Sequence, residues 1–323
     1  MAALPLILDT DLDTDCDDVG ALAMAQALQR RGVIRLEAVI CSAPVPACGP
    51  CALLLNEYAG TPTLPVGVFT LPPAQRSPRF DLYDDHRRRA AEYYGPAGLY
   101  NEILVRSRFG ANSPALPSAL SVYRRRLAGA PPNSVTICAI GTLSALAELL
   151  DSEADDASPL SGPELVRQKV RLLVTMAIGT YPAGRDGFNW AMDLPGAARV
   201  LNDWPTELAV SPAGEDVQTG AALSTACHAE NPFRRAYEIH RGGPGRSRSS
   251  WDQVALLYAA GLAPELFQQT AGRGLHFAAA SGQHTWLEAP AAAPRRHVLP
   301  LPDAETLARL IEPWMLAGAA PLA

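Results

Sequence analysis

Two kinds of residue block alternate along this chain. Short continuous apolar or β-branched runs are typical of buried strands, whereas longer Ala/Leu-rich stretches with one apolar face are typical of helices. The alternation predicts an α/β fold with a mixed, mostly parallel central sheet and helices on both faces. The predicted strands span 4–8, 34–41, 64–68, 133–140, 169–178, 207–211, 275–279 and 285–288, and the predicted helices span 19–28, 48–58, 85–94, 114–127, 142–150, 194–202 and 302–316.

The composition varies along the chain without marking a domain boundary. Residues 70–113 are rich in Pro, Arg, Asp and Tyr, and they predict surface loops around the helix at 85–94. Residues 151–163 predict an acidic connector. The arginine runs 87–89 and 124–126 are expected to lie on solvated helix faces. Since no repeat and no linker is visible, we expect a single domain over 1–323.

The most informative segment is an acidic turn near the N-terminus. It follows the strand at 4–8 and precedes the helix at 19–28, so it is expected at the carboxyl end of a strand, where open α/β sheets bind ligands. Carboxylates this close together cannot all stay ionised without compensation. Some can use the helix N-terminus, and the others need a cation. Oxygen ligands favour Ca²⁺ or Mg²⁺ over zinc. The turn holds six aspartates within ten residues: Asp9, Asp11, Asp13, Asp15, Asp17 and Asp18.

Three other interpretations of the turn can be compared with this one. Acidic residues are common as helix caps, and one or two of the aspartates fit that role. An EF-hand loop counted from Asp11 needs Gly at its sixth position and Glu at its twelfth, but Cys16 and Leu22 stand there. A Mg²⁺-dependent phosphohydrolase of the haloacid dehalogenase type also opens with a strand and D-x-D. Its usual Thr or Val two residues after the second Asp is missing here, so it is the second choice.

Charge and composition exclude several classes of partner. The 323 residues are 48% apolar, which supports a sizeable core, and carry a net charge of −6 with a pI near 5.6. This balance argues against nucleic acid or an anionic membrane as a main partner. No apolar run is long enough for a transmembrane helix, and no basic segment of a signal peptide precedes the first strand. We therefore expect a cytoplasmic protein with reduced cysteines.

Three further blocks follow the acidic turn in order. They are IGTLS at 140–144, the pair MAIG at 176–179 and FNW at 188–190 with Asp193, and SWD at 250–252. Together with DTD at 9–11 and DCDD at 15–18, they resemble the signature segments of the nucleoside hydrolases, the inosine–uridine-preferring N-ribohydrolase superfamily. The opening looks closest to a bacterial branch with a D-T-D-x-G-x-D-x-D-D pattern. The similarity covers about residues 5–315.

The resemblance implies a Ca²⁺ site and a hydrolytic mechanism. By position, Asp11, Asp18 and Asp252 would bind the ion through carboxylates, and Ile140 through its backbone carbonyl. A metal-bound water would attack C1′ of the ribose after losing its proton to an aspartate. The turn is two residues longer here than in many members, so Asp15 and Asp17 both remain candidates for this catalytic base.

The chain departs from the family pattern at three positions. Asp13 stands where related sequences often have Gly, and we expect an extra solvated carboxylate there, the alternative being a reshaped turn. Gly187 replaces a glutamate that grips the ribose, so Asp186 beside it is the candidate for that role. Trp251 replaces a histidine that protonates the leaving base in some members; tryptophan cannot donate that proton, but it can stack on a purine.

The predicted function is hydrolysis of a ribonucleoside to ribose and free base in purine or pyrimidine salvage. The resemblance also implies a homodimer or homotetramer and a small-molecule nucleoside as substrate. Two alternatives are the phosphohydrolase above and a metal-binding paralogue with impaired catalysis, because the ribose-binding glutamate is missing. For Trp190, core packing is the alternative to substrate contact. The residues expected to contact substrate are Asn189, Asp186, Phe188, Trp190, Trp251, His86 and His240.

Overall fold

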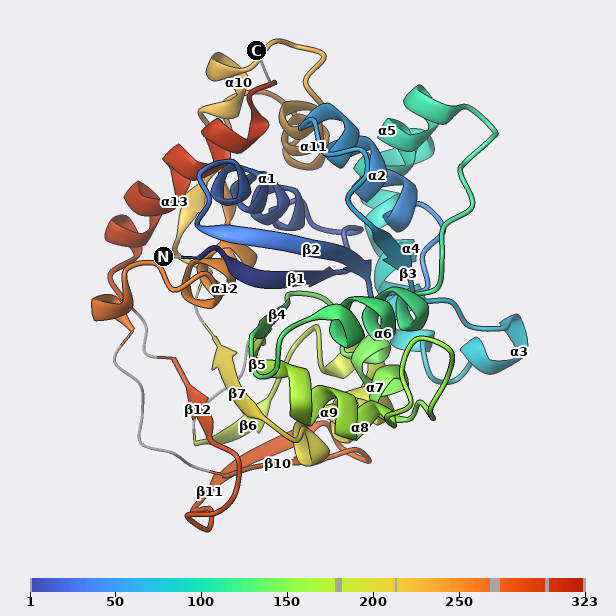
Figure 1. Ribbon diagram of the computed structural model, residues 1–323. Helices are drawn as coiled ribbons and strands as arrows, with labels where there is room; N and C mark the ends of the chain where they lie inside the picture. The colour runs from blue at the N-terminus through green and yellow to red at the C-terminus, as the bar shows by residue number, and fades with distance from the viewer. Residues whose placement is uncertain (1, 178–181, 213, 268–273, 300–301, 322–323) are drawn as a thin grey trace.

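A seven-stranded sheet forms the centre of the molecule (Figure 1). The computed structural model describes residues 2–177, 182–212, 214–267, 274–299 and 302–321. The strand order is β12-β7-β5-β4-β1-β2-β3, and every neighbouring pair is parallel. The strands are β1 (Leu4–Thr10), β2 (Ile34–Cys41), β3 (Val66–Val68), β4 (Val135–Ala139), β5 (Val170–Met176), β7 (Glu207–Ser211) and β12 (Arg296–Val298).

Helices cover both faces of this sheet, which explains why its central strands β1, β4 and β5 are mostly apolar. On one face α1, α12 and α13 pack together, with α2 and α11 beside them; α6, α7, α8 and α9 cover the other face (Figure 1). Their bounds are α1 (Asp17–Arg30), α2 (Cys48–Tyr58), α6 (Ala119–Gly129), α7 (Ser144–Leu150), α8 (Gly162–Lys169), α9 (Leu194–Asp203), α11 (Pro232–Arg241), α12 (Trp251–Ala259) and α13 (Ala304–Ala319). Among the described residues, no helix has both the length and the apolar character needed to cross a bilayer.

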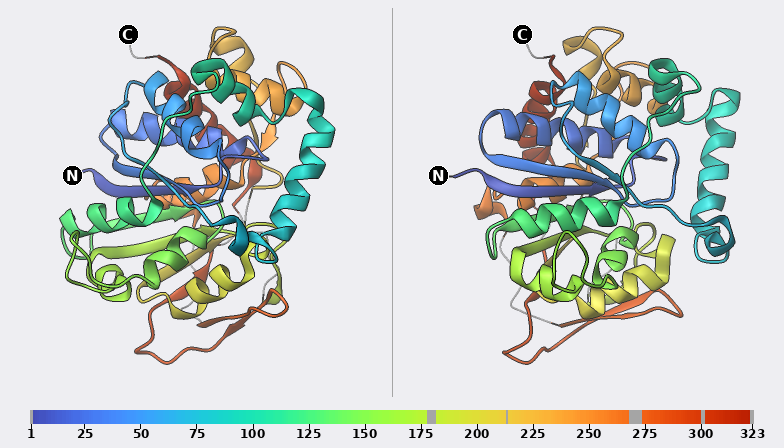
Figure 2. Two further views of the ribbon diagram at one scale, coloured as in Figure 1. Left: turned by 90° about the vertical axis from the view of Figure 1, so that its right-hand side faces the viewer. Right: turned by 45° about the vertical axis from the view of Figure 1, so that its right-hand side comes forward.

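Smaller elements complete the fold. Antiparallel pairing occurs in two small sheets, one of β10 (Gly274–Ala278), β11 (Gln283–Leu287) and β6 (Ala183–Arg185), the other of β8 (Gln218–Thr219) and β9 (Arg248–Ser249). Helix α4 (Asp81–Tyr94) stands at the side of the body, near the carboxyl ends of the strands (Figure 2). The remaining helices are α3 (Pro73–Arg76), α5 (Tyr100–Phe109) and α10 (Leu223–Ala226), with single 3₁₀ turns at Gly95–Ala97, Ala191–Asp193 and Pro264–Leu266.

The predicted α/β architecture is confirmed, and β2, β7 and α2 have the predicted bounds. The prediction for 70–113 is wrong in part, because α5 buries Tyr100, Leu104 and Val105 where loops were expected. The connector at 151–163 ends early, since Ser161 and Glu164 form a capping box that starts α8. Residues 178 and 179, which belong to a predicted strand and a family block, lie outside the described residues.

Candidate active site

The acidic turn lies at the carboxyl end of β1, between the ends of β4 and β2. The Ile140 N–H at the end of β4 donates to the Asp9 carbonyl at 2.7 Å. Gly141 allows a close approach, because a Cβ there would lie 2.5 Å from the Asp11 nitrogen. A pocket of about 370 Å³ opens at this edge. Its walls are the carboxylates Asp11, Asp15, Asp17, Asp18 and Asp252, the rings of His86, Tyr93, Tyr94, Phe188, His240 and Trp251, and Thr14, Ile140, Met176, Asn189, Arg241 and Arg248.

Four of these carboxylates are buried, and no cationic side chain of the described residues is bonded to them. They belong to Asp11, Asp17, Asp18 and Asp252. Oxygen atoms of Asp17, Asp18 and Asp252 lie within 4.8 Å of one another. Burial, and then the charge of neighbouring aspartates, raises the pKa of Asp11 and Asp252 well above the ordinary value. Burial raises the pKa of Asp18 to about 7, even though Thr10 donates a hydrogen bond to it. Asp11 Oδ2 accepts no hydrogen bond from the described residues. This set of crowded, buried oxygens fits a hard divalent cation such as Ca²⁺.

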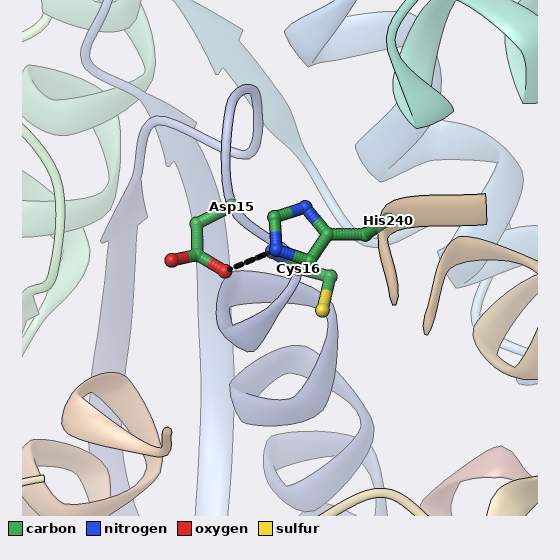
Figure 3. A group of neighbouring side chains, drawn as sticks. All are labelled: Asp15, Cys16 and His240. Carbon is green, nitrogen blue, oxygen red and sulfur yellow. Dashed lines mark hydrogen bonds and ion pairs between the residues drawn. The ribbon is translucent and has the colours of Figure 1, made fainter. Parts of the chain in front are cut away.

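Asp15 is different, because the protein supplies its positive charge. Arg248 Nε lies 2.8 and 2.9 Å from the two oxygens of Asp15, and a terminal nitrogen of Arg248 also donates to it. His240 Nε2 lies 3.3 Å from Asp15 Oδ1 (Figure 3). Burial alone would raise the pKa of Asp15, but the hydrogen bonds and charge of Arg248, together with His240, outweigh it and lower that pKa. Asp15 is therefore ionised, and both of its oxygens are already bonded to Arg248.

The cluster of Asp15, Cys16 and His240 does not fit a metal, although its ligand atoms lie close together (Figure 3). Burial raises the pKa of the Cys16 thiol well above its usual range, so the thiol stays protonated. Both ring nitrogens of His240 already have partners, Nδ1 the Tyr94 hydroxyl and Nε2 the Asp15 carboxylate. The aspartate charge is already balanced by Arg248. A cation is therefore favoured only at the neighbouring aspartates.

Most of the residues expected to contact substrate do line the pocket. The ring of His86 meets the ring of Phe188 edge to face, with 4.8 Å between the ring centroids. The Arg248 guanidinium lies over the Trp251 ring at 4.9 Å, a cation–π contact. The side-chain amide of Asn189 donates to the carbonyl of Ile140 at 3.0 Å. His240 also lies in the pocket wall.

Two of the residues predicted to contact substrate, Trp190 and Asp186, do not line the pocket. Trp190 is 1% exposed, donates from Nε1 to Thr175 at 3.1 Å and packs edge-on against Phe277, so it belongs to the core. Asp186 lies outside the pocket lining, and its Oδ2 accepts the backbone N–H groups of Phe188 at 3.1 Å and Trp190 at 2.7 Å. Asp186 therefore shapes the turn that presents Phe188 and Asn189.

The expectation that Asp13 is a solvated carboxylate is wrong. This carboxylate is fully buried and accepts hydrogen bonds from Tyr83, Arg87 and Asn101. Arg87 is consequently not part of a solvated face, unlike its neighbour Arg88, whose side chain is 61% exposed. In the second arginine run, Arg124 is buried by bonds to Ser152, Ser158 and Leu160. A buried arginine needs partners that only the folded chain brings together.

Sequence reasoning gave no site role to six residues that line the pocket, which are Thr14, Tyr93, Tyr94, Met176, Arg241 and Arg248. The tyrosine pair closes an amphipathic segment, which was a usable signal for an aromatic rim. Arg248 lies three residues before Trp251, shortly after the glycine-rich segment 242–245. Nothing in its local pattern pointed to Asp15, which is 233 positions away.

Comparison with solved structures identifies the architecture. A plant nucleoside hydrolase, PpNRh1, matches with a TM-score of 0.66 at 19% identity, over 97% of this chain and 98% of its own. The inosine–uridine preferring nucleoside hydrolase of Bacillus anthracis matches with a TM-score of 0.64 at 16% identity, over 99% and 100%. The chain has the nucleoside hydrolase fold.

The type III effector protein XopQ shares this fold. Its structure in complex with adenosine diphosphate ribose matches with a TM-score of 0.70 at 17% identity, over 100% of this chain and 95% of that one. No family model matches the sequence, and no curated relative matches it. At identities this low, the similarity establishes the fold, and the chemistry has to be argued from the pocket.

Proposed function

We propose that this chain is a Ca²⁺-dependent hydrolase that cleaves the N-glycosidic bond of a ribonucleoside to give ribose and free base. One observation carries the proposal. Four buried carboxylates, from Asp11, Asp17, Asp18 and Asp252, share one pocket at the carboxyl edge of β1 and have no bonded cationic partner there. The nucleoside hydrolase fold of the chain gives this arrangement its chemical context.

The ion would be held by oxygen atoms alone. Asp18 and Asp252 are the two carboxylates that sequence and geometry both favour, and Ile140, whose carbonyl is the further candidate ligand, also lines the pocket. Bound there, Ca²⁺ supplies a charge that lowers the pKa of a water molecule and binds the neighbouring hydroxyls of a ribose. Zinc is disfavoured, because neither a histidine nor a thiolate belongs to the set.

Asp11 and Asp17 divide the two remaining tasks, which are a third carboxylate ligand and the acceptor of the water's proton. An oxygen of Asp17 lies within 4.8 Å of oxygens of Asp18 and Asp252. The Oδ2 atom of Asp11 accepts no hydrogen bond from the described residues. Asp15 performs neither task, because Arg248 already neutralises it and lowers its pKa. A carboxylate with a lowered pKa is a weak base.

The pocket walls suit the other two parts of the substrate. The carboxylates stabilise positive charge that develops on the ribose ring when the glycosidic bond breaks. Phe188, His86, Tyr94 and Trp251 offer apolar faces on which a nucleobase can stack. The binding of adenosine diphosphate ribose by XopQ supports a ribosyl ligand. We propose a role in purine or pyrimidine salvage in the cytoplasm, with a homodimer or homotetramer as the working form.

A panel of purine and pyrimidine ribonucleosides, assayed for free reducing sugar with and without chelator, tests the proposal. We expect ribose release that is lost with EGTA and restored by Ca²⁺. Ca²⁺ binding without turnover on any ribonucleoside would favour the impaired paralogue. Phosphate release from a phosphomonoester with Mg²⁺ would favour the phosphohydrolase, which the fold does not support.

A further inference from the structure

Asp13 is a buried carboxylate of the acidic turn that does not reach the pocket. Its side chain is fully buried. Arg87 Nε lies 3.1 and 3.0 Å from its two oxygens, Tyr83 donates to it at 3.2 Å, and Asn101 donates at 2.9 Å. The first two donors come from α4 and the third from α5. One side chain of the turn thus holds two helices.

The contacts extend beyond Asp13 on both sides. Asn101 Nδ2 also donates to the Leu12 carbonyl at 3.1 Å, and Arg87 donates to Glu102 at 2.6 Å. Leu12 has a φ of +42°, a left-handed conformation that costs energy for a residue with a Cβ. The hydrogen bonds of Asn101 and Asp13 hold the turn in this conformation. The position of the turn and the positions of α4 and α5 therefore depend on one another.

Outside this network, α4 also contacts the body through Asp84 with Arg76, His86 with Phe188, and Tyr94 with His240. Of its 14 residues, Tyr83 is the one that is buried, and the helix stands at the side of the body (Figure 2). Yet His86, Tyr93 and Tyr94 of α4 form part of the pocket wall. Tyr83, Arg87 and Tyr94 are spaced by four and seven residues, so they share one helix face. The face that Asp13 holds is also the face that carries Tyr94 to His240.

We propose that Asp13 is a positioning residue that fixes α4 over the pocket, and thereby sets the wall against which the nucleobase packs. The ligand named here rests on the proposed function, while the attachment of α4 does not. Removing the carboxylate frees α4 from the turn and weakens substrate binding. We expect the ion site and the chemistry to be retained, because Asp13 does not line the pocket and the hydrogen bond from Asn101 to the Leu12 carbonyl still holds the turn.

The test compares Asp13→Asn and Arg87→Gln with Arg88→Gln, a matched control on the same helix whose side chain is 61% exposed. Hydrogen exchange of the α4 amides reports the attachment without any substrate. Calcium titration and steady-state kinetics report the pocket. For Asp13→Asn and Arg87→Gln we expect exchange in 81–94 to quicken at least about tenfold and KM to rise about tenfold, with kcat within about twofold of wild type. Calcium affinity and the exchange of α1 should not change, and Arg88→Gln should match wild type.

Each outcome decides the matter. Unchanged exchange of α4 in both variants overturns the proposal, as does faster exchange throughout the protein, which is general destabilisation. A fall in kcat at unchanged KM also overturns it. If Asp13→Asn does not fold, Arg87→Gln decides alone. If wild type hydrolyses no ribonucleoside, the proposed function fails, and the exchange data still judge the attachment.

Discussion

Replacing Arg248 by methionine tests the assignment of Asp15 as a charge-paired, non-catalytic carboxylate. The change keeps the apolar stem over Trp251 but leaves Asp15 ionised without its cation. A hydrogen bond to a charged group contributes about 1.5–3 kcal/mol to stability, and breaking a fully buried ion pair costs about 3–5 kcal/mol. The two side chains here are 27% and 22% exposed, so water screens part of the effect. We expect a loss of about 2 kcal/mol in the free energy of unfolding at pH 7.

The pH dependence gives this prediction its sign. In wild type the pKa of Asp15 is lowered in the folded state, so the pair stabilises the protein above the unfolded pKa of about 3.9 and the contribution is lost as pH falls through the lower folded value. Without Arg248, burial raises the pKa of Asp15, so stability falls as pH rises above that unfolded value. The difference between wild type and variant should therefore be largest at neutral pH and shrink as the pH falls toward about 4.

The assay is urea unfolding in EGTA at a series of pH values. Arg246→Met is the matched control, since Arg246 is exposed and lies two residues away. The double variant Arg248→Met/Asp15→Asn should recover part of the loss, because the unpaired charge is gone. A loss that is equal at pH 4 and pH 7, or one that the double variant does not reduce, would refute the charge-pair reasoning.

Three further predictions concern the carboxylates and the core. Asp18→Asn and Asp252→Asn should each abolish Ca²⁺ binding in calorimetric titration and turnover of ribonucleosides, yet raise the melting temperature in EGTA, because each removes a buried, repelled charge. Wild type in EGTA should become more stable as pH falls from 7 to 5, since the folded pKa of Asp18 is raised to about 7 and protonation then favours the folded state; saturating Ca²⁺ should remove this trend in thermal melts. Trp190→Ala should lower the free energy of unfolding by about 3–5 kcal/mol in urea titrations, while Trp190→Phe should leave KM within about twofold, as a core side chain requires.

The local sequence pattern was sufficient to predict the elements whose side chains serve only to pack the core. The apolar strands β2 and β7 and the helix α2 have the predicted bounds, because burial on both faces or on one stripe leaves a direct periodic signal. Helix α5 and the start of α8 were missed, since short helices owe their stability to packing and caps rather than to a long repeat. The position of the acidic turn between a strand and a helix was predicted from the patterns of these two flanking elements.

The sequence by itself determined that carboxylates crowd at the end of β1 and that they need positive charge. Their number and spacing are local properties, and repulsion between like charges follows directly from them. Only the tertiary structure decided how each one is compensated. Arg248 arrives from 233 positions away to neutralise Asp15, and α4 and α5 bring the donors that bury Asp13. Pairing of this kind depends on distances in space, which residues close in sequence do not encode.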